Sequence, residues 1–330
     1  MKKDIFIFNS GRLCRKNDTL MFEGDEGKKY IPVNDVECIY IFGEVDINKS
    51  LLEFLCSSKI MLHFYNYYEY YVGTFYPREY LNSGFVILRQ SETYLNYEKR
   101  MILAKTFISG AIKNILQVLK YYNRRNCEID DEIVQISALL QVLDEQITVE
   151  SVMAVEGNVR QLYYGCFNKI MNDNDFEFVS RTKRPPKDRI NSLISFGNSI
   201  IYTLVLSQIY QTQLDPRIGY LHSTNDRRFS LNLDIAEIFK PIIVDRTIFS
   251  VINKKIITKK DFNNDLGGII LKDEGRMRFI KEMNEKLETT IKHPDLPSRV
   301  SYKRLIRLEA YKVQKYITED KTYEPFVAKW

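Results

Sequence analysis

GYLHSTNDRRFSLNLDIAEIFKP, residues 219–241, is the most informative stretch of this chain, since a strand-like or loop segment leads there into a short helix. It holds His222, one of three histidines in the sequence, which precedes Asp234 by twelve residues and Glu237 by fifteen. Asp234 and Glu237 are three residues apart, so a helix places them on one face. An imidazole close to two carboxylates suits a divalent-metal site that acts on a phosphodiester.

A third carboxylate, Glu156, lies in AVEGNVRQLYYGCF, residues 154–167, which has the spacing of an amphipathic helix. Gly157 leaves room beside it for a second backbone or a substrate. Each of these groups also has a simpler explanation. Glu156 can form an ordinary helix ion pair with Arg160. The carboxylates after residue 230 can favour the positive end of a helix dipole, and the histidine can be a hydrogen-bonded turn residue.

A basic segment, SRTKRPPKDRINSLISFGNSIIYTL, occupies residues 180–204. Its two prolines favour extended backbone and bar helix before them, so the basic side chains are presented on a stiff loop ahead of a helix that Asp188 can cap. Such a loop can grip phosphates, and the alternative is a solvated basic loop. The candidate DNA-binding residues are Arg181, Lys183, Arg184, Lys187, Arg189, Asn191, Arg227 and Arg228, the last two being alternatively a charge balance for nearby acids.

Composition indicates a globular protein of two domains, since the chain has 330 residues of which 45% are hydrophobic. Residues 1–85 hold ten Lys and Arg against twelve Asp and Glu, whereas the remainder holds 38 against 31. A polyanionic partner is therefore expected to meet the second part. Five scattered cysteines without CxxC spacing, and no secretory signal, indicate a cytoplasmic protein. Residues 190–214 are uncharged but carry many polar side chains, so we expect a core helix and no membrane partner.

The order of patterns along the chain predicts an α+β fold, with a small N-terminal β domain over residues 1–85 and a larger all-α catalytic domain over 86–330. Short β-rich runs separated by turns fill the first part, with one short helix over 48–58. The linker is expected over 77–91. Helices are expected over 92–125, 131–144, 149–172, 188–212, 274–291 and 298–318, and a hairpin over 261–275 that turns near Gly267.

Taken together and in this order, the segments at 154–164, 180–204 and 219–241 resemble the CRISPR-associated protein one family, the integrase of CRISPR spacer acquisition. The resemblance extends across the whole chain. It implies that Glu156, His222 and Glu237 are ligands of Mg²⁺ or Mn²⁺, and that Asp234 is a further catalytic residue, either beside the ligands or as an alternate one. It also implies a homodimer, formed through the β domain, that works with a small ferredoxin-like CRISPR adaptation subunit.

The activity implied by the resemblance is metal-dependent transesterification, in which the 3′-hydroxyl ends of prespacer DNA are joined to the repeat of a CRISPR array, together with DNA endonuclease activity. Two other functions stay open. One is a metal-dependent nuclease for branched or other DNA in repair, which would use the same ligands with water as the nucleophile. The other is a noncatalytic nucleic-acid-binding scaffold with a degenerate site.

Overall fold

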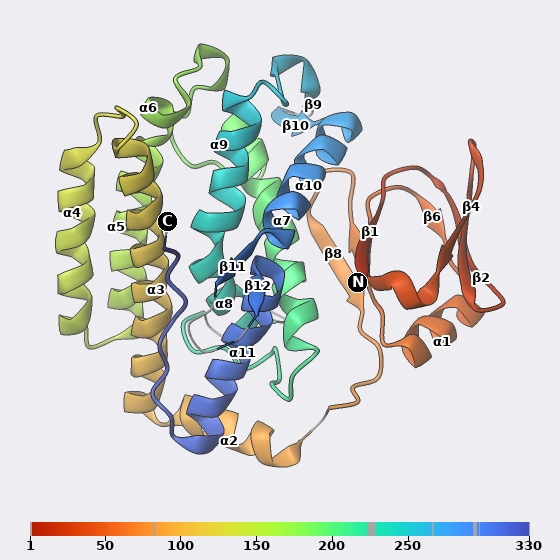
Figure 1. Ribbon diagram of the computed structural model, residues 1–330, viewed down its shortest axis with the longest axis horizontal. Helices are drawn as coiled ribbons and strands as arrows, with labels where there is room; N and C mark the ends of the chain where they lie inside the picture. The colour runs from red at the N-terminus through yellow and green to blue at the C-terminus, as the bar shows by residue number, and fades with distance from the viewer. Residues whose placement is uncertain are drawn as a thin grey trace. The chain divides into compact units, whose positions relative to one another are not determined.

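The computed structural model describes residues 2–81, 83–222, 229–265, 267–292, 296 and 298–329, and it divides the chain into two compact units, Met1–Asn82 and Ser83–Trp330 (Figure 1). The sequence placed the boundary between residues 85 and 86. A region of β-strands is followed by a mostly helical region, so the predicted α+β class is confirmed. The second unit is not purely helical, because it also contains two short hairpins.

In the described part of the first unit the strands form two four-stranded sheets, with orders β1-β5-β7-β8 and β4-β3-β2-β6. In the first sheet β1, β5 and β7 run parallel and β8 is antiparallel to β7. In the second, β2, β3 and β4 form an antiparallel meander. The strands are β1 (Lys3–Ile7), β2 (Gly11–Lys16), β3 (Thr19–Gly24), β4 (Gly27–Pro32), β5 (Val36–Ile41), β6 (Val45–Asp46), β7 (Met61–Tyr65) and β8 (Tyr71–Phe75).

The core of the first unit joins both sheets to helix α1 (Lys49–Ser58). Asn48 begins this helix, since its side chain accepts a hydrogen bond from the Leu51 amide at 3.0 Å. Leu13, Ile39 and Leu55 are fully buried in this core. The strands expected from the sequence and the short helix over 48–58 are therefore present.

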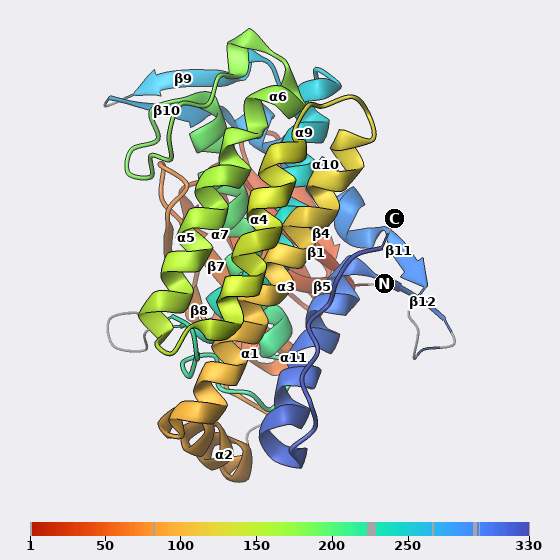
Figure 2. The same cartoon turned by 90° about the vertical axis from the view of Figure 1, so that its left-hand side faces the viewer.

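The second unit is built on α3, against which α4, α5 and α8 all pack. Figure 2 shows α3, α4 and α5 side by side. The helices of this unit are α2 (Gly84–Leu95), α3 (Tyr97–Asn123), α4 (Asp130–Val142), α5 (Val149–Gly165), α6 (Phe167–Met171), α7 (Arg189–Ile209), α8 (Leu231–Lys240), α9 (Arg246–Asn253), α10 (Asp273–Glu288) and α11 (Tyr302–Glu319), with a π-helical turn, Pro241–Asp245, between α8 and α9.

Several helices and the linker of the second unit differ from those expected. The single helix expected over 92–125 is two helices, because Asn96 leaves the helical conformation and caps α3 by accepting from the Lys99 amide. Since α2 begins at Gly84, the expected linker over 77–91 is wrong in its second half. The helix expected over 149–172 is interrupted at Cys166. Helix α9 was not expected, because it has only eight residues and its apolar pattern covers too few turns to be distinct.

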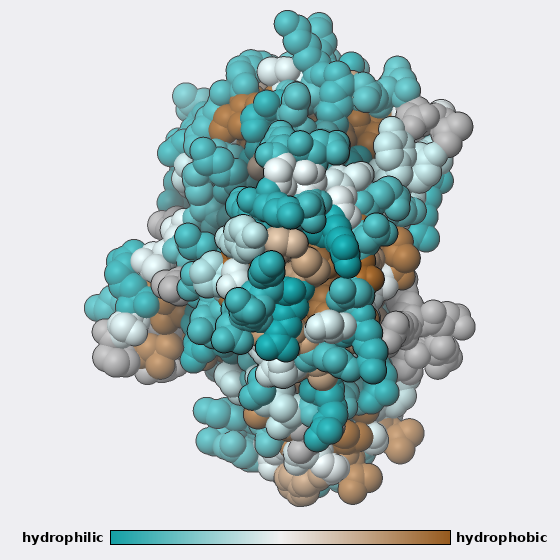
Figure 3. Space-filling model, turned by 90° about the vertical axis from the view of Figure 1, so that its right-hand side faces the viewer, coloured by the Kyte–Doolittle hydropathy of each residue, from teal (hydrophilic) through white to brown (hydrophobic). Residues whose placement is uncertain are grey.

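Helix α7 packs on α8 and α11, and its length and composition match those of a membrane span, as do those of α3. Most of each helix is packed within the protein, since 78% of an 18-residue stretch of α7 and 67% of such a stretch of α3 are buried. A Cβ built on Gly197 would lie 2.5 Å from Val244 Cγ1, so glycine is what permits α7 to lie against the π-helical turn. On the face of the molecule drawn in Figure 3, hydrophilic side chains dominate and hydrophobic ones form separate patches.

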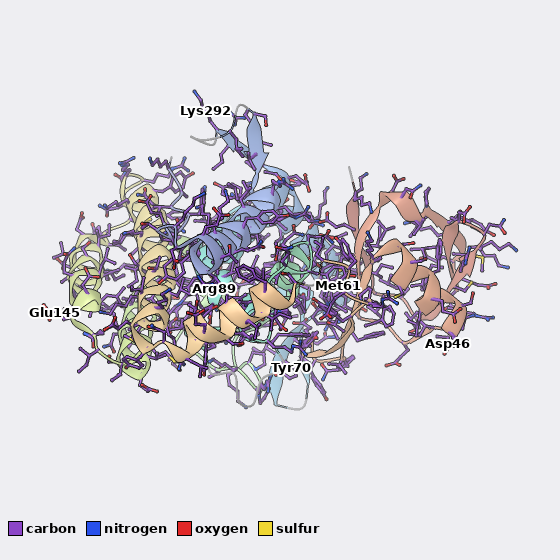
Figure 4. All side chains as sticks on the ribbon, turned by 90° about the horizontal axis from the view of Figure 1, so that it is seen from below. Asp46, Met61, Tyr70, Arg89, Glu145 and Lys292 are labelled. Atoms are coloured by element: carbon purple, nitrogen blue, oxygen red, sulfur yellow. The ribbon has the colours of Figure 1, made fainter. Side chains whose placement is uncertain are left out.

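The remaining strands form small hairpins, β9 (Phe262–Asp265) with β10 (Gly268–Leu271) and β11 (Thr290–Lys292) with β12 (Arg299–Ser301). The first is the hairpin that the sequence predicted. Helix α2 packs on α11, and Arg89 of α2, labelled in Figure 4, pairs with Asp320 just beyond α11 at 3.7 Å. The five cysteines are free thiols.

Candidate active site

Two helices that both pack on α3 carry the acidic residues predicted for the site. Helix α5 carries Glu156 and, one turn later, Arg160. It begins with a capping box in which Thr148 and Ser151 each satisfy the other's backbone amide. Helix α8 carries Asp234 and Glu237, and its last residue is Lys240. The spacing of three residues therefore places the two α8 carboxylates on one face, as expected.

Asp234 holds the turn that contains His222. Its carboxylate is fully buried and accepts hydrogen bonds from the backbone amides of Tyr220, Leu221 and His222, at 2.6, 3.1 and 3.0 Å. It also meets His222 Nδ1 at 2.8 Å. Because Nδ1 is bonded to the carboxylate, Nε2 is the ring nitrogen left to face another ligand. Asp234 is therefore a support for the histidine, with both oxygens already occupied.

Gly219 is required by the close approach of this turn to α8. A Cβ built at Gly219 would lie 2.9 Å from Asp234 Oδ2 and 2.8 Å from Ser230 Oγ. Ser230, just before α8, accepts from the Gly219 amide at 2.9 Å and donates to the Arg217 carbonyl at 2.8 Å. The turn and the start of α8 are thus joined at several points, which fixes the imidazole relative to the helix.

Glu237 is buried and is held between two cations. One oxygen accepts from Arg160 Nη2 at 2.6 Å, and the other accepts from Lys240 Nζ. Burial alone would raise the pKa of Glu237, but the charges of Lys240, Arg160 and His222 together lower the pKa to about 2. This carboxylate is therefore ionised at neutral pH.

Arg160 connects Glu237 to Glu156. Its Nε donates to Glu156 Oε1 at 2.9 Å, while Nη2 is bonded to Glu237. The Glu156 side chain is 28% exposed, against 4% for Glu237. The four residues predicted from the sequence thus form two groups, Glu156 and Glu237 joined by Arg160, and His222 bonded to Asp234. Helix α8 carries one member of each group. The structure also includes the simple Glu156–Arg160 ion pair that was the alternative interpretation.

Among the residues described, no three His, Cys, Asp or Glu side chains are already arranged to hold a metal ion. Arg160 and Lys240 instead occupy both oxygens of Glu237, and Arg160 occupies one oxygen of Glu156. Burial favours loss of the proton from Lys240, yet Glu237 raises the pKa of Lys240 overall, so it remains an ammonium. The sequence did not single out Lys240, although its position three residues after Glu237 was a usable signal.

Asp245, at the end of the π-helical turn, is a further buried acid that the sequence did not indicate. Its Oδ2 lies 3.9 Å from Arg160 Nη1. Burial raises the pKa of Asp245 to about 6, although Arg160 opposes that rise. Tyr163, two turns after Glu156 on α5, is fully buried, and burial together with the charge of Asp245 raises the pKa of Tyr163.

A model of the family described as CRISPR associated protein Cas1 matches residues 5–285 of the chain. The chain belongs to the Cas1 family. A relative named CRISPR-associated endonuclease Cas1 2, from Thermodesulfovibrio yellowstonii, is 54% identical over 330 residues and covers all of both chains. A solved Cas1 protein from Thermotoga maritima has a TM-score of 0.89 at 45% identity, covering 99% of this chain and 100% of that one.

The Cas1 fold also occurs in more distant solved structures. A casposase bound to an integration product has a TM-score of 0.89 at 22% identity, covering 99% of this chain and 93% of the casposase. A Cas6-RT-Cas1–Cas2 complex has a TM-score of 0.84 at 18% identity, covering 100% of this chain and 36% of that one. At these identities the likeness establishes the fold alone.

The basic segment of this Cas1-family chain is largely tied down internally. Arg181 donates to Asn191 Oδ1 at 2.8 Å and to Ser195 Oγ at 3.0 Å, and Asn191 donates to the Ser180 carbonyl at 2.7 Å. Arg189 Nη1 donates to the Asp175 carbonyl at 2.6 Å. These three side chains therefore support the loop, whatever else they contact.

The exposed candidates for DNA contact are Lys183, Arg184 and Lys187. Lys187 donates to the Gly267 carbonyl at 2.7 Å, which ties the basic loop to the β9–β10 hairpin. DNA contact by these residues stays a prediction. Arg227 and Arg228 lie outside the described residues.

Proposed function

We propose that this chain is a CRISPR spacer-acquisition integrase, which joins the 3′-hydroxyl ends of prespacer DNA to the repeat of a CRISPR array by metal-dependent transesterification. The observation that carries the proposal is the meeting of Glu156 and Glu237 at Arg160, with His222 bonded to Asp234 one turn before Glu237 on α8, in a member of the Cas1 family. The same site, with water as the nucleophile, accounts for endonuclease activity, after which the relatives are named.

The donor set fits Mg²⁺ or Mn²⁺. Glu156 and Glu237 provide hard anionic oxygens, and His222 provides an imidazole nitrogen whose partner nitrogen is fixed by Asp234. When bound, the ion would supply charge neutralisation and a template for the reacting phosphate. The partial exposure of Glu156 provides access from solvent, whereas the burial of Glu237 excludes water from that carboxylate.

The chain's own cations complement the charge that develops in the reaction. In transesterification one P–O bond forms as another breaks, the attacking hydroxyl loses a proton and the leaving oxygen gains one, so no other energy source is needed. The phosphate oxygens gain negative charge on the way. Lys240 stays protonated, because Glu237 raises its pKa, and it therefore contributes charge and cannot act as a base. Asp234 keeps the imidazole in one orientation throughout.

The partners we propose are prespacer and repeat DNA, a second copy of the chain bound through the β domain, and a small ferredoxin-like adaptation subunit. The basic excess of the helical part supports DNA as a partner. The solved Cas1–Cas2 complex of the same fold supports a subunit of the Cas2 kind.

A strand-joining assay tests the proposal. The full chain and its adaptation subunit are incubated with Mn²⁺, a repeat-containing plasmid and labelled DNA with 3′-hydroxyl ends. We expect covalent attachment of the label, which a dideoxy 3′ end abolishes. Glu156→Ala and His222→Ala should each abolish joining, whereas Glu150→Ala, an exposed position on the same helix, should not.

Two outcomes would contradict the proposal. Release of plasmid fragments without attachment of the label would favour the metal-dependent nuclease, which hydrolyses the bond. Joining that persists in Glu156→Ala and His222→Ala would move the active centre elsewhere. A chain that binds DNA without either reaction, with both substitutions silent, would be the noncatalytic scaffold.

A further inference from the structure

Arg160 has contacts with three carboxylates through three different nitrogens. Nε is bonded to Glu156 at 2.9 Å and Nη2 to Glu237 at 2.6 Å, while Nη1 lies 3.9 Å from Asp245 Oδ2. Two of these contacts are hydrogen bonds of normal length and the third is longer than a hydrogen bond. The guanidinium of Arg160 therefore forms hydrogen bonds with Glu156 and Glu237, but it lies too far from Asp245 to form one.

Asp245 is the acid of the three that lacks sufficient partners. It is 2% exposed, and within the described residues neither its Oδ2 nor the hydroxyl of neighbouring Tyr163 makes a hydrogen bond of normal geometry. Burial raises the pKa of Asp245, whereas Lys240 and Arg160 lower that of Glu237. Buried polar atoms are almost always bonded, so an orphaned carboxylate oxygen beside an arginine requires an explanation.

The backbone that carries Asp245 is unusual as well. Asp245 is the last residue of the π-helical turn Pro241–Asp245, which follows α8, the helix that carries Glu237. Such turns are rare in proteins and occur frequently at functional sites. The extra residue in the turn changes the direction in which the following side chain projects, and here that side chain faces Arg160.

We propose that Arg160 is a counter-cation that exchanges places with the divalent metal: it neutralises Glu156 and Glu237 in the metal-free protein, and it moves onto Asp245 when the metal binds. The inference rests on the metal site of the proposed function. The exchange explains why, in the described residues, Glu237 is bonded to two cations and no metal-binding group is preformed. It also explains why the buried Asp245 has an oxygen without a hydrogen bond 3.9 Å from Arg160, a gap that a small side-chain movement can close. Asp245 acts here through Arg160 and is a positioning residue.

The test measures Mn²⁺ affinity of the full chain, from the free-ion signal in electron paramagnetic resonance. Asp245→Asn keeps the shape of the side chain and removes its charge, so Arg160 loses its alternative position. A hydrogen bond to a charged group is worth enough to change an affinity about tenfold, and we expect Mn²⁺ to bind about tenfold more weakly. Asp175→Asn, which removes the exposed Lys259–Asp175 pair, is the matched control and should leave the affinity unchanged.

Simple loss of a negative charge near the site also weakens cation binding, so a double-mutant cycle is needed. In an Arg160→Gln background the exchanging cation is absent, and Asp245→Asn should then change Mn²⁺ affinity by less than about twofold. An equal loss in both backgrounds would overturn the exchange, as would wild-type affinity in Asp245→Asn. Glu156→Ala separates the two proposals: if it leaves Mn²⁺ binding intact, the metal site itself is wrong, and the exchange fails with it.

Discussion

Asp245→Asn should stabilise the metal-free protein, although it removes an ionic neighbour of Arg160. Burial raises the pKa of Asp245 from 3.8 to about 6, and Arg160 offsets only part of that rise. A carboxyl whose folded pKa exceeds its unfolded value favours the fold while protonated and costs stability once ionised. Since one unit corresponds to about 1.4 kcal/mol, the ionised Asp245 costs about 3 kcal/mol in the metal-free fold.

The pH dependence follows from the same shift. The contribution of protonated Asp245 is fully present below the unfolded pKa of 3.8 and is lost as pH rises through the folded value of about 6. Asparagine does not ionise, so the advantage of the variant should be absent at the acid end of this window and complete above it. Arg160 keeps its hydrogen bonds to Glu156 and Glu237 in the variant, and no cation is stranded.

The measurement is urea unfolding followed by circular dichroism at 222 nm, which reports on the helical unit, between pH 4 and 8 with a chelator present. Asp175→Asn is again the control, since its pair with Lys259 is exposed and contributes little. The reasoning is refuted if Asp245→Asn is less stable than the wild type at pH 8, or if the difference between them does not change with pH.

Three further predictions concern the same helices. Glu237→Gln should lower the free energy of unfolding by about 3–5 kcal/mol at pH 7, because two buried cations lose their partner, and this loss should shrink as pH falls from 4.5 toward 2 in chelator-treated protein. Asp234→Asn should abolish strand joining and lower stability by about 1–3 kcal/mol, because the amide cannot accept all of the bonds that the carboxylate accepts; retained joining would contradict this. Gly197→Ala should cost about 1–3 kcal/mol in urea unfolding by overpacking, and an unchanged midpoint would show that the π-helical turn can yield.

The fold was predictable where local patterns agree with the tertiary structure. Alternating apolar residues indicated the strands of the first unit, and the turn at Gly267 indicated the hairpin. The break between α2 and α3 was missed, because the hydrophobic pattern continues across residue 96 and only the cap marks the boundary. Helix α9 was missed since it has only eight residues, too few for the helical period to be distinct from a buried strand.

The sequence indicated the histidine, three of the acids and the Glu156–Arg160 ion pair of the candidate site, and it did not indicate Lys240 or Asp245. Glu156, His222 and Glu237 stood out because the family resemblance gave each a role. Arg160 and Lys240 belong to residue types that usually lie on solvated helix faces, so their burial depends on how α5 and α8 pack on α3. Sequence spacing alone does not contain that information.

Asp245 shows this limit most clearly, because it follows Glu237 by eight residues and an uninterrupted α-helix would not direct it at Arg160 in the same way. Only the π-helical turn sets its direction. Glu156 can therefore be both an ion-pair partner of Arg160 and a metal ligand, in different states of the protein. In the exchange proposed above, the ion pair is the metal-free arrangement, and Arg160 needs another carboxylate partner when a metal replaces it. In the same proposal, Asp245 destabilises the metal-free protein and becomes the partner of Arg160 once the metal binds, so the site would trade stability for function.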